Sequence, residues 1–437
     1  MEQKEVAKTT KVQGRWRNLW LLAFASLIDG VEGGVLGILF TVMRSALGLT
    51  TASLGVISAV SKLVGAVAGP LWGIAGDRYS RKSILVFATG VWGLWTIAIG
   101  FSQNYTQLLI LIAIAAVGSA ATVPLINSVL SDLFPDADRG KATGILAGIL
   151  GILGIVAIVL MGSLGEIPDG WRLGYYVSGG LSVASGILLL LFFNDPVRGQ
   201  TDEGMAGVAN AASETYQFSF DQYRELFKIS SLNLMLADKF LIGTVTLFTF
   251  LPTFLVDFRG FTAADSSVVL AGLAAGLGIG RFVAGWLSDR VDSRGLNARP
   301  AIYHISLVIS FVFLVASLAI DFGSEIGPYA LINLLLGFAL AFDNPIMHPM
   351  IARITTPEVR SSAYGIWQSG AERLGDVVFT LVVGLLANQM GLDNVLLYLV
   401  SGLVFIRILL WILVYRFYPA NVEATDSVLA SRRTKLS

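Results

Sequence analysis

The sequence predicts an all-α membrane protein with twelve transmembrane helices arranged as two six-helix bundles. Of its 437 residues, 55% are hydrophobic and only 14% are charged, whereas about 25% of the residues of an average soluble domain are charged. The hydrophobic residues lie in long runs, and about 20 such residues in a helix cross the hydrocarbon core of a bilayer. Composition and run length together favour a membrane protein over a soluble one.

Twelve runs are long enough to span. The predicted spans are 19–43, 51–76, 83–101, 106–130, 140–162 and 172–193, followed by 231–256, 264–287, 301–320, 327–352, 362–388 and 394–415. Between the two sets lies a segment of charged, small and turn-forming residues that is too polar to span. The predicted organisation is an N-terminal tail (1–18), an N-terminal bundle (19–193), a linker (194–230), a C-terminal bundle (231–415) and a C-terminal tail (416–437).

The distribution of Lys and Arg predicts the orientation of these spans. Positive charge in short loops resists translocation and marks the cytoplasmic side. With both termini in the cytoplasm, the outer segments contain only three of the 30 Lys and Arg residues, namely Arg44, Arg172 and Arg259. The first apolar run is too long for a signal-peptide core and lacks a clear cleavage site. We therefore expect a multi-pass protein of the cell membrane with cytoplasmic termini.

Composition also excludes several function classes. The formal net charge is zero, so no basic surplus indicates nucleic-acid binding. The chain has no cysteine and only two histidines, which excludes disulfides and thiolate metal sites and makes a histidine zinc site improbable. The glycine-rich segment 272–280 lies inside a span and lacks the Lys-Ser or Lys-Thr of a phosphate loop. We expect no cofactor, no metal and no enzymatic activity, because no nucleophile and base lie at usable spacing.

Two sets of residues recur in the second half of the chain, as expected for a transporter built from internal repeats. The pattern Gly-xxx-Asp-Arg follows the second and the eighth spans, as Gly73, Asp77, Arg78 and as Gly285, Asp289, Arg290. A second set lies at the fourth and tenth spans, as Pro124, Arg139, Gly144 and as Pro345, Arg360, Gly365.

These motifs resemble those of the major facilitator superfamily over nearly the whole chain. The Gly-xxx-Asp-Arg-xx-Arg-Lys run at 73–82 is similar to the signature loop of that superfamily. Within it, the chain is most similar to the spinster-like lipid transporters, through Gly-Asp-Arg-Tyr-Ser-Arg-Lys at 76–82, Asp-Pro-Val-Arg-Gly at 195–199, Arg-Ser-Ser-Ala at 360–363 and Leu-Gly-Asp at 374–376. The resemblance implies the major facilitator fold and an amphipathic anionic substrate such as a lysophospholipid or a sphingoid phosphate.

The chain departs from the spinster-like pattern at two places. The first span of that subfamily carries an Asp-Arg pair, where this chain has Asp29 and Gly30. Its fourth span carries an Arg and a Glu, which align with Ile112 and Ser119. If those groups handle the proton in the subfamily, coupling in this chain is rearranged or absent.

Charged residues within spans are the candidates for a substrate or proton site, because a charge at mid-bilayer costs about 2.5–3.5 kcal/mol on insertion scales. Asp29 and Glu32 are three residues apart and share one face of the first span. Lys62 of the second span lies at a similar depth. We interpret the three as a proton or substrate site in which Lys62 attracts an anionic group. The alternative is a buried structural ion pair.

The eleventh and seventh spans carry a second group of candidates. Glu372 and Asp376 share a face, whereas Arg373 is turned aside. Two ionised carboxylates this close repel each other, which suits proton uptake. The alternative is a salt-bridge cluster with Lys239 or Arg407. On the seventh span, Asp238 and Lys239 point in different directions, so each needs its own partner.

The tenth span contains a predicted break at Asp343-Asn344-Pro345. Broken helices near the midplane often border transport sites, because their freed backbone groups face a cavity. His348 is rotated about 140° from Asp343 on a helix of 3.6 residues per turn, so the two do not share a face. His348 is a candidate for titration near neutral pH. The alternative is a histidine that is only hydrogen-bonded.

The repeated loop motifs predict a gate. Asp77 and Asp289 lie at helix ends, where they can bond a neighbouring helix N-terminus. Arg78, Arg81 and Arg290 can pair with acids such as Asp132. The predicted gating set is Gly73, Asp77, Arg78, Arg81, Asp132, Arg139, Gly285, Asp289, Arg290 and Arg360. Positive-inside topology alone would explain the basic residues but not the repeated aspartates.

Glycines on two spans predict close helix packing, since small residues let helix backbones approach in a membrane. They are Gly65, Gly69, Gly73 and Gly76 on the second span and Gly144, Gly148, Gly151 and Gly154 on the fifth.

The function predicted from the sequence is secondary active transport by alternating access, coupled to protons because no nucleotide motif is present and the candidate sites are rich in carboxylates. The expected partners are a small-molecule or lipid substrate, protons and membrane lipid, with the protein a monomer. One alternative is an exporter of drugs or small organic solutes, in which Asp29 and Glu32 bind a cation. The other is a nontransporting membrane sensor, against which the short tails argue.

Overall fold

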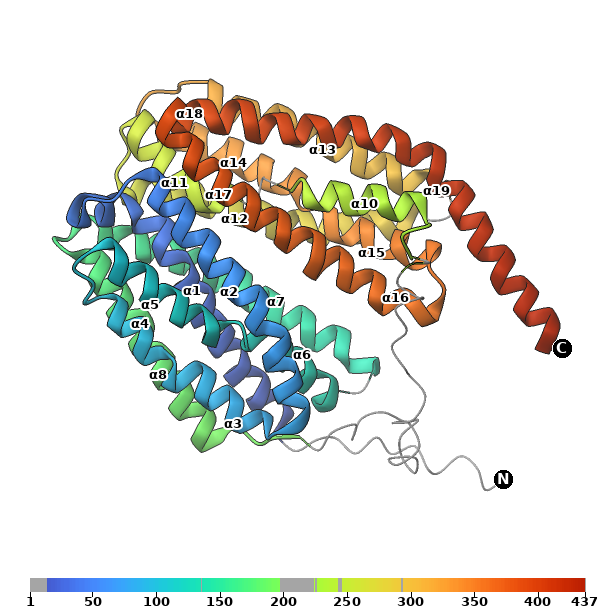
Figure 1. The fold of residues 1–437 in the computed structure, drawn as a ribbon, viewed down its shortest axis with the longest axis horizontal. Helices are drawn as coiled ribbons and strands as arrows, with labels where there is room; N and C mark the ends of the chain where they lie inside the picture. Colours follow the sequence, from blue (N-terminus) through green and yellow to red (C-terminus); the bar gives the residue numbers. More distant parts are fainter. Residues whose placement is uncertain are drawn as a thin grey trace. The chain divides into compact units, whose positions relative to one another are not determined.

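The computed structural model is helical, and the residues that it describes contain no strand. These residues are 14–134, 136–196, 224, 226–242, 246–291 and 294–436. Figure 1 shows the order of the helices along the chain.

The helices of the first half of the chain are α1 (Arg15–Leu47), α2 (Thr51–Arg78), α3 (Arg81–Leu85), η1 (Val86–Val91), α4 (Gly93–Ile99), α5 (Tyr105–Ser119), α6 (Thr122–Leu133), α7 (Asp136–Ser163), η2 (Leu164–Glu166) and α8 (Gly170–Phe192). Those of the second half are α10 (Ser230–Phe240), α11 (Thr246–Arg259), α12 (Ala263–Val291), α13 (Ala298–Ala319), α14 (Ile326–Leu340), α15 (Asp343–Ile354), α16 (Pro357–Tyr364), η5 (Gly365–Glu372), α17 (Arg373–Met390), α18 (Leu392–Asn394), η6 (Val395–Val400) and α19 (Ser401–Leu436).

Ten helical segments among the described residues are long and apolar enough to cross a membrane. The predicted seventh span is absent from this set because its helix is interrupted. α10 ends at Phe240, and a tight turn follows in which the N–H of Ile242 donates to the carbonyl of Lys239 at 3.3 Å. The prediction of one continuous helix over 231–256 is therefore wrong. The predicted eleventh span is also absent from the set. It is helical from α16 through α17, but its three charged residues, Glu372, Arg373 and Asp376, make it less apolar than the other spans.

The tenth and eleventh spans also differ from a plain α-helix. The tenth is broken as predicted, since α14 ends at Leu340 and α15 begins at Asp343. The eleventh contains the π-helical segment η5, which ends at Glu372. π-Helical turns are rare and are frequent at functional sites. Both irregularities bring acidic side chains into the interior of the chain's second half.

By their contacts, the described residues form two compact units. The first unit takes residues from Met1–Val35, Val64–Ala157 and Asp169–Gln217. The second takes residues from Leu36–Leu63, Ile158–Pro168 and Phe218–Ser437. One end of each of the helices α1, α2 and α7 thus belongs to the second unit. The bundle boundaries read from the sequence, which follow hydropathy rather than contacts, stay a prediction.

The core of the first unit is built from aliphatic side chains of α1, α3, α6 and α8. Leu19, Leu85, Leu125 and Leu189 are all buried in this cluster. Figure 1 shows α4 and α8 side by side. The pair is close at its glycines, because a Cβ on Gly93 would lie 2.7 Å from the Cβ of Ser182.

The core of the second unit combines aromatic and aliphatic side chains of α10, α13, α15, η5 and α19. Leu232, Tyr303, Ile346, Trp367 and Trp411 are all buried there. Polar groups of the candidate site described below emerge from this same cluster. The packing of these large side chains therefore fixes the helices that carry the site.

Glycines also mediate close packing of α12, whereas the four glycines predicted to do so on the fifth span do not, among the described residues. A Cβ on Gly280 would lie 2.6 Å from Ala341 Cβ, and a Cβ on Gly337 would lie 3.1 Å from the amide nitrogen of Leu277. α12 and α14 thus pack with their backbones in contact.

The predicted packing role is wrong for most of the other glycines. Among the described residues, nothing lies within 4 Å of a Cβ built on Gly65 and Gly73 of α2 or on Gly144, Gly148, Gly151 and Gly154 of α7. Of the four α2 glycines in the predicted set, only Gly76, with Leu125 at 2.5 Å, and Gly69, with the Ala120 carbonyl at 3.7 Å, have such neighbours. Glycine content on a span does not show which neighbouring helix lies against it.

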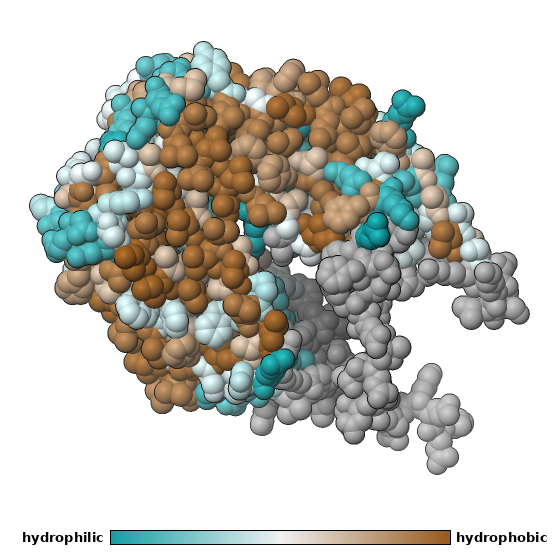
Figure 2. Space-filling view, viewed as in Figure 1, coloured by the Kyte–Doolittle hydropathy of each residue, from teal (hydrophilic) through white to brown (hydrophobic). Residues whose placement is uncertain are grey.

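The exterior of the helices is apolar. Leu190 and Leu191 on α8 are 55% and 64% exposed, and Phe282 on α12 is 80% exposed. Figure 2 shows brown, apolar side chains over much of the face in view. Exposed apolar surface on this scale is stable in lipid rather than in water. The chain is an integral, multi-pass membrane protein.

The contact between α12 and α14 predicts a difference between two neighbouring glycines of α12. Gly276→Ala should lower the thermal unfolding midpoint of the purified protein, because a Cβ there would lie 2.8 Å from the Leu334 carbonyl carbon. Gly278→Ala is the matched control, since nothing described lies within 4 Å of its Cβ. Alanine is favoured over glycine in a helix by about 0.5–1 kcal/mol, so the control should be neutral or stabilised. Equal midpoints for the two variants would contradict this packing.

Candidate functional site

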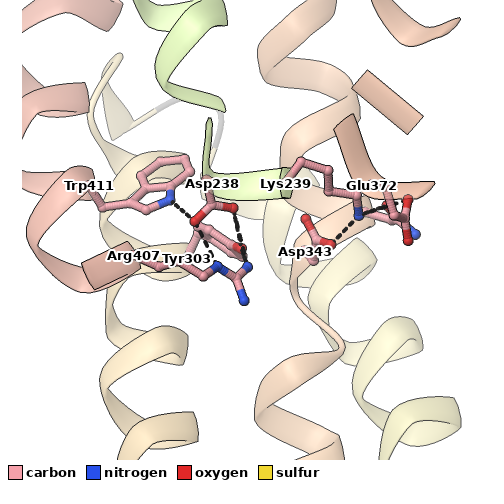
Figure 3. A network of polar contacts seen from close by, with 8 residues as sticks. Asp238, Lys239, Tyr303, Asp343, Glu372, Arg407 and Trp411 are labelled. Atoms are coloured by element: carbon pink, nitrogen blue, oxygen red, sulfur yellow. Dashed lines mark hydrogen bonds and ion pairs between the residues drawn. The ribbon is translucent and has the colours of Figure 1, made fainter. Parts of the chain in front are cut away.

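A fully buried ion pair joins α10 to α19. Nε of Arg407 donates to Oδ1 of Asp238 at 3.0 Å and Nη2 donates to Oδ2 at 3.2 Å. Tyr303 and Trp411 add hydrogen bonds of 3.0 and 2.9 Å to the same carboxylate. Asp238 is 0% exposed and Arg407 only 2%. Figure 3 shows how the side chains of Arg407, Tyr303 and Trp411 converge on the Asp238 carboxylate.

The next residue along α10, Lys239, faces a different set of partners. Its ammonium group forms an ion pair with Asp343, donates to Oδ1 of Asn344 at 3.2 Å and lies 3.3 Å from Oε2 of Glu372. The same group lies 4.4 Å from the ring centroid of Trp367, within cation–π range. Asp238 and Lys239 therefore have separate partners, as predicted (Figure 3). One cation serves two carboxylates in this cluster.

Both polar clusters border one cavity of about 250 Å³ in the second unit. Its charged and hydrogen-bonding lining comes from five helices: Arg281 of α12, Tyr303, Ser306 and Ser310 of α13, Asp343 and Asn344 of α15, Glu372 of η5 and Arg407 of α19. The remaining lining is mainly apolar, from residues such as Leu277, Leu307 and Leu340. The cavity combines an apolar wall with a few charged groups, which is typical of a small-molecule site.

Lys62 pairs with the eleventh span rather than with a carboxylate of its own predicted bundle. Its ammonium group lies 2.7 Å from Oδ1 of Asp376 and 2.9 Å from Oγ1 of Thr380. Thr380 also donates to Asp376 at 3.3 Å. The expectation that Lys62 acts beside Asp29 and Glu32 therefore has no support from its contacts. The alternative of an ion pair fits Lys62, although its partner is Asp376.

Asp29 and Glu32 share one face of α1, within the first unit. Glu32 accepts a hydrogen bond from Thr96 of α4. Oδ2 of Asp29 is buried without a hydrogen-bond partner, and neither carboxylate forms an ion pair within the described part of the chain. Among the described residues, no cation balances these two carboxylates of the first unit.

Two other candidates of the second half have less polar surroundings. The ring of His348 lies 4.8 Å from that of Tyr364 and 5.1 Å from that of Trp367, centroid to centroid. It is not among the residues that line the cavity. Arg373 is exposed, and no described residue forms a hydrogen bond or an ion pair with it. Within the described part of the chain, His348 therefore borders the Lys239 cluster through Trp367 without forming a hydrogen bond or an ion pair with it, and Arg373 belongs to neither polar cluster.

The signature loop of the first half is held by two carboxylates. Arg81 forms an ion pair with Asp132, and both side chains are 8% exposed. Asp195, from the motif after the sixth span, accepts hydrogen bonds from the Ser80 hydroxyl at 3.0 Å and from the Lys82 N–H at 3.3 Å. The predicted pairing of Arg81 with Asp132 is thus present.

The other predicted gating residues lie in less constrained surroundings. Arg360 donates to the carbonyl of Ala352 at 3.0 Å, near the end of α15. Arg290 lies over the ring of Trp286 at 5.1 Å. Arg78 and Asp289 are exposed, and a Cβ on Gly285, like one on Gly73, would meet no described atom within 4 Å. The side chains of Asp77 and Arg139 lie outside the described residues.

A seam within the second unit joins the ends of α1 and α2 to α11 and α17. Arg44 forms two hydrogen bonds with Asp257, at 2.7 and 2.5 Å. The N–H of Ala52 donates to the side chain of Asn388 at 3.3 Å. A Cβ on Gly55 would lie 2.6 Å from Gly384 Cα, so the two helices are in backbone contact there. We call these contacts, together with Lys62–Asp376, the α1–α2 seam.

Sequence reasoning left several residues of this site out of its candidate set. Arg281, Tyr303, Arg407, Trp411 and Thr380 line the cavity or bind the predicted acids. The signal for the two arginines was present, since both lie within spans, where an isolated charge is costly. Tyr303, Trp411 and Thr380 carry no such signal, because neutral polar side chains are common in membrane helices.

A polytopic helical protein with charged groups around an interior cavity has the architecture of a membrane solute transporter. The sequence profile of the Major Facilitator Superfamily matches residues 22–298, which is more than half of the chain. The protein belongs to this superfamily. It is therefore a transporter and not an enzyme.

Two curated relatives and one solved structure illustrate the similarity. Protein spinster of Drosophila melanogaster is 23% identical over 389 residues, which are 86% of this chain and 62% of the relative. The cis,cis-muconate transport protein of Acinetobacter baylyi is 23% identical over 293 residues, 66% of this chain and 70% of the relative. A crystal structure of a bacterial homologue of the human lysosomal transporter Spinster aligns with a TM-score of 0.78 at 17% identity, covering 95% of this chain and 98% of that one. The chain spans less than two thirds of the Drosophila protein.

Together these comparisons establish the fold that the sequence predicted. The family profile and the structural alignment agree on the major facilitator fold, and the spinster proteins are relatives within the superfamily. Small-molecule transport by a multi-pass membrane protein follows from membership in the superfamily.

The buried pair Asp238–Arg407 predicts a strong coupling of two substitutions. Asp238→Asn should destabilise the protein by about 3–5 kcal/mol, because the Arg407 charge is then buried without a counter-charge. The double variant Asp238→Asn with Arg407→Gln should lose less than the sum of the single losses. Unfolding of the four purified proteins in one detergent measures this. Additive losses would show that the two side chains stabilise the fold independently.

Proposed function

We propose that the protein is a proton-coupled secondary transporter that moves an anionic amphipathic solute, such as a lysolipid, by alternating access. The observation that carries proton coupling is the Asp29–Glu32 pair in the first unit. An ionised carboxylate away from water is unfavourable unless a counter-charge or a proton balances it. With no cation beside the pair among the described residues, a proton that binds and leaves there is the simplest balance.

The anionic class of substrate is supported by two features. The spinster-like resemblance implies an anionic lipid. The Acinetobacter relative is named as a transport protein for cis,cis-muconate, which is an organic anion. Positively charged side chains also line the cavity of the second unit. An anionic solute is the counterpart that such a lining attracts.

A second candidate is an exporter of cationic drugs or organic solutes. It is favoured by the same carboxylates, since Asp29 and Glu32 would bind a cationic group as readily as a proton. Purified protein in liposomes with an internal pH dye distinguishes the two. Proton flux that appears only with lysophospholipids or sphingoid phosphates supports the first candidate, and flux only with cationic dyes supports the second. Substrate movement without proton flux would make the protein a facilitator.

Alternating access gives the α1–α2 seam a role. With both termini in the cytoplasm of the cell, the seam lies on the outer side of the membrane, near Arg44 and Arg259. Lys62–Asp376 and Arg44–Asp257 would hold the outer side closed, and they would break when it opens. Arg81–Asp132, on the opposite side, belongs to the inner gate. We propose this arrangement for a monomer.

Glu32→Gln tests the proton site. The amide keeps the shape and the hydrogen bond to Thr96 but carries no proton across, so substrate-driven proton flux in liposomes should fall by about tenfold or more. Exchange of substrate across the membrane, which needs no net proton movement, should persist. Glu166→Gln, at an exposed position of η2, is the matched control and should behave as the wild type. Unchanged proton flux in Glu32→Gln would remove Glu32 from the mechanism.

The α1–α2 seam can be tested by cross-linking, because the chain contains no native cysteine. Ala52→Cys combined with Asn388→Cys, treated with a short reducible thiol cross-linker, should stop transport, and a reductant should restore it. Each single-cysteine variant, treated identically, should remain active. Full transport by the cross-linked double variant would show that the seam does not open during the cycle.

A further inference from the structure

We propose that the cavity of the second unit is a binding subsite for one anionic group, a carboxylate or a phosphate, held by the guanidinium groups of Arg281 and Arg407. The inference deepens the proposed transport function by naming a part of its substrate site. It rests on three observations on the second unit: an unpaired arginine in mid-helix, a second arginine with an unused donor, and a cavity that both of them line.

Arg281 has no structural partner to explain its position. It lies ten residues before the end of α12, which is about 15 Å along a helix and so about half the depth of a bilayer. Arginine at such a depth is costly and normally faces a partner or a cavity. Its side chain is exposed and lines the cavity, and no described residue forms a hydrogen bond or an ion pair with it. The guanidinium is therefore available to a ligand.

Arg407 is held in place and still has an unused donor. Nε and Nη2 bind Asp238, and Nη2 also donates to Tyr303 at 2.5 Å. Nη1 is buried and has no hydrogen-bond partner among the described residues. A guanidinium is a rigid fork, so the bonds to Asp238 fix the direction of Nη1. A buried donor left without a partner costs free energy, which a bound acceptor would recover.

The other cationic group near the cavity is already engaged. Lys239 is shared between Asp343 and Glu372, and these two acids more than balance its single charge. The cavity serines are also committed, since Ser306 donates to the Tyr303 carbonyl and Ser310 to the Ser306 carbonyl, each at 2.7 Å. Among the lining groups, the two arginines are thus the charged donors that remain for a ligand. Arginine pairs well with carboxylates and phosphates, because its paired N–H groups match their oxygens.

The size of the cavity limits what it holds. At about 250 Å³ it is near the lower end of small-molecule sites, which enclose roughly 300–1,000 Å³. A small organic acid fits as a whole, with its carbon atoms against Leu277, Leu307 and Leu340. Of a lysolipid, only the charged headgroup fits, and its chain must lie elsewhere. The shared chemistry is one anionic group.

The test measures binding to the purified, full-length protein by isothermal titration calorimetry in detergent. The probes are benzoate and its neutral isostere benzamide for a free organic acid, and lysophosphatidate and a neutral monoacylglycerol for a lipid headgroup. Arg281→Gln should weaken binding of an anionic probe by at least about tenfold, because a hydrogen bond to a charged group contributes more than the 1.4 kcal/mol that corresponds to tenfold. Arg281→Lys should retain part of the affinity. Arg294→Gln, an exposed arginine away from the cavity, is the matched control and should bind as the wild type.

Arg281→Gln should fold normally, since Arg281 has no ion pair to lose, and its unfolding midpoint verifies this. Binding of benzoate but not benzamide, lost in Arg281→Gln, supports the subsite with a small organic acid as its ligand. If lysophosphatidate binds but the neutral monoacylglycerol and benzoate do not, and Arg281→Gln abolishes this binding, the subsite is supported with a lipid headgroup as its ligand. Equal binding by Arg281→Gln and the wild type, equal binding of anionic and neutral probes, or no binding of either anion to the wild type overturns the proposal.

The binding experiment is independent of proton coupling. If liposomes show no proton flux but Arg281-dependent anion binding persists, the subsite stands and the coupling does not. If proton flux with anionic lipid is present and Arg281→Gln leaves both binding and flux unchanged, the transport function stands and the subsite does not.

Discussion

The cost of placing charge inside a membrane protein governs the interior of the second unit. Asp238 and Lys239 are adjacent on α10 and nearly inaccessible, so each must find a counter-charge on another helix. Asp238 takes Arg407 from α19, and Lys239 takes acids from α15 and η5. One short helix thereby ties together most of the helices that surround the cavity. The break of the seventh span after Phe240, one residue past Lys239, and the break of the tenth directly before Asp343 lie at this same centre.

Much of the architecture could be predicted from hydropathy, because the length of an apolar run is set by the bilayer. The spans, the break at Asp343, the pairing of Arg81 with Asp132 and the separate partners of Asp238 and Lys239 were all predictable from local pattern and helical geometry. Helix rotation and packing were not, because one chain's pattern does not specify which helix faces another. This is why Lys62 was expected beside Asp29 and Glu32 and instead binds Asp376. The interruption after Phe240 was missed because the run over 231–256 is long and carries no charge apart from Asp238 and Lys239, so that its composition fits a single span.

The glycines show the same limit. Gly276, Gly280 and Gly337 hold α12 against α14, whereas the evenly spaced glycines of α7 face no described atom within 4 Å. The spacing of glycines along a helix predicts which face they share, but it does not predict which other helix packs against that face. The arginines of the cavity show the converse, since their positions within spans were visible in the sequence. The sequence could not show that Nη1 of Arg407 has no hydrogen-bond partner among the described residues. This depends on how Asp238 and Tyr303 are placed around the guanidinium group.

The π-helical segment η5 contains Trp367 and Glu372 and is followed directly by α17, which carries Asp376. A π-turn contains one residue more than an α-turn, and that surplus residue can pass to the next turn without any change in the ends of the helix. When the extra residue moves along the helix by one turn, the side chains between its old and its new position rotate by about 100° around the helix axis. Such a change of winding would turn Glu372 relative to Lys239 while the two ends of the eleventh span stay in place, without a rigid displacement of the whole helix.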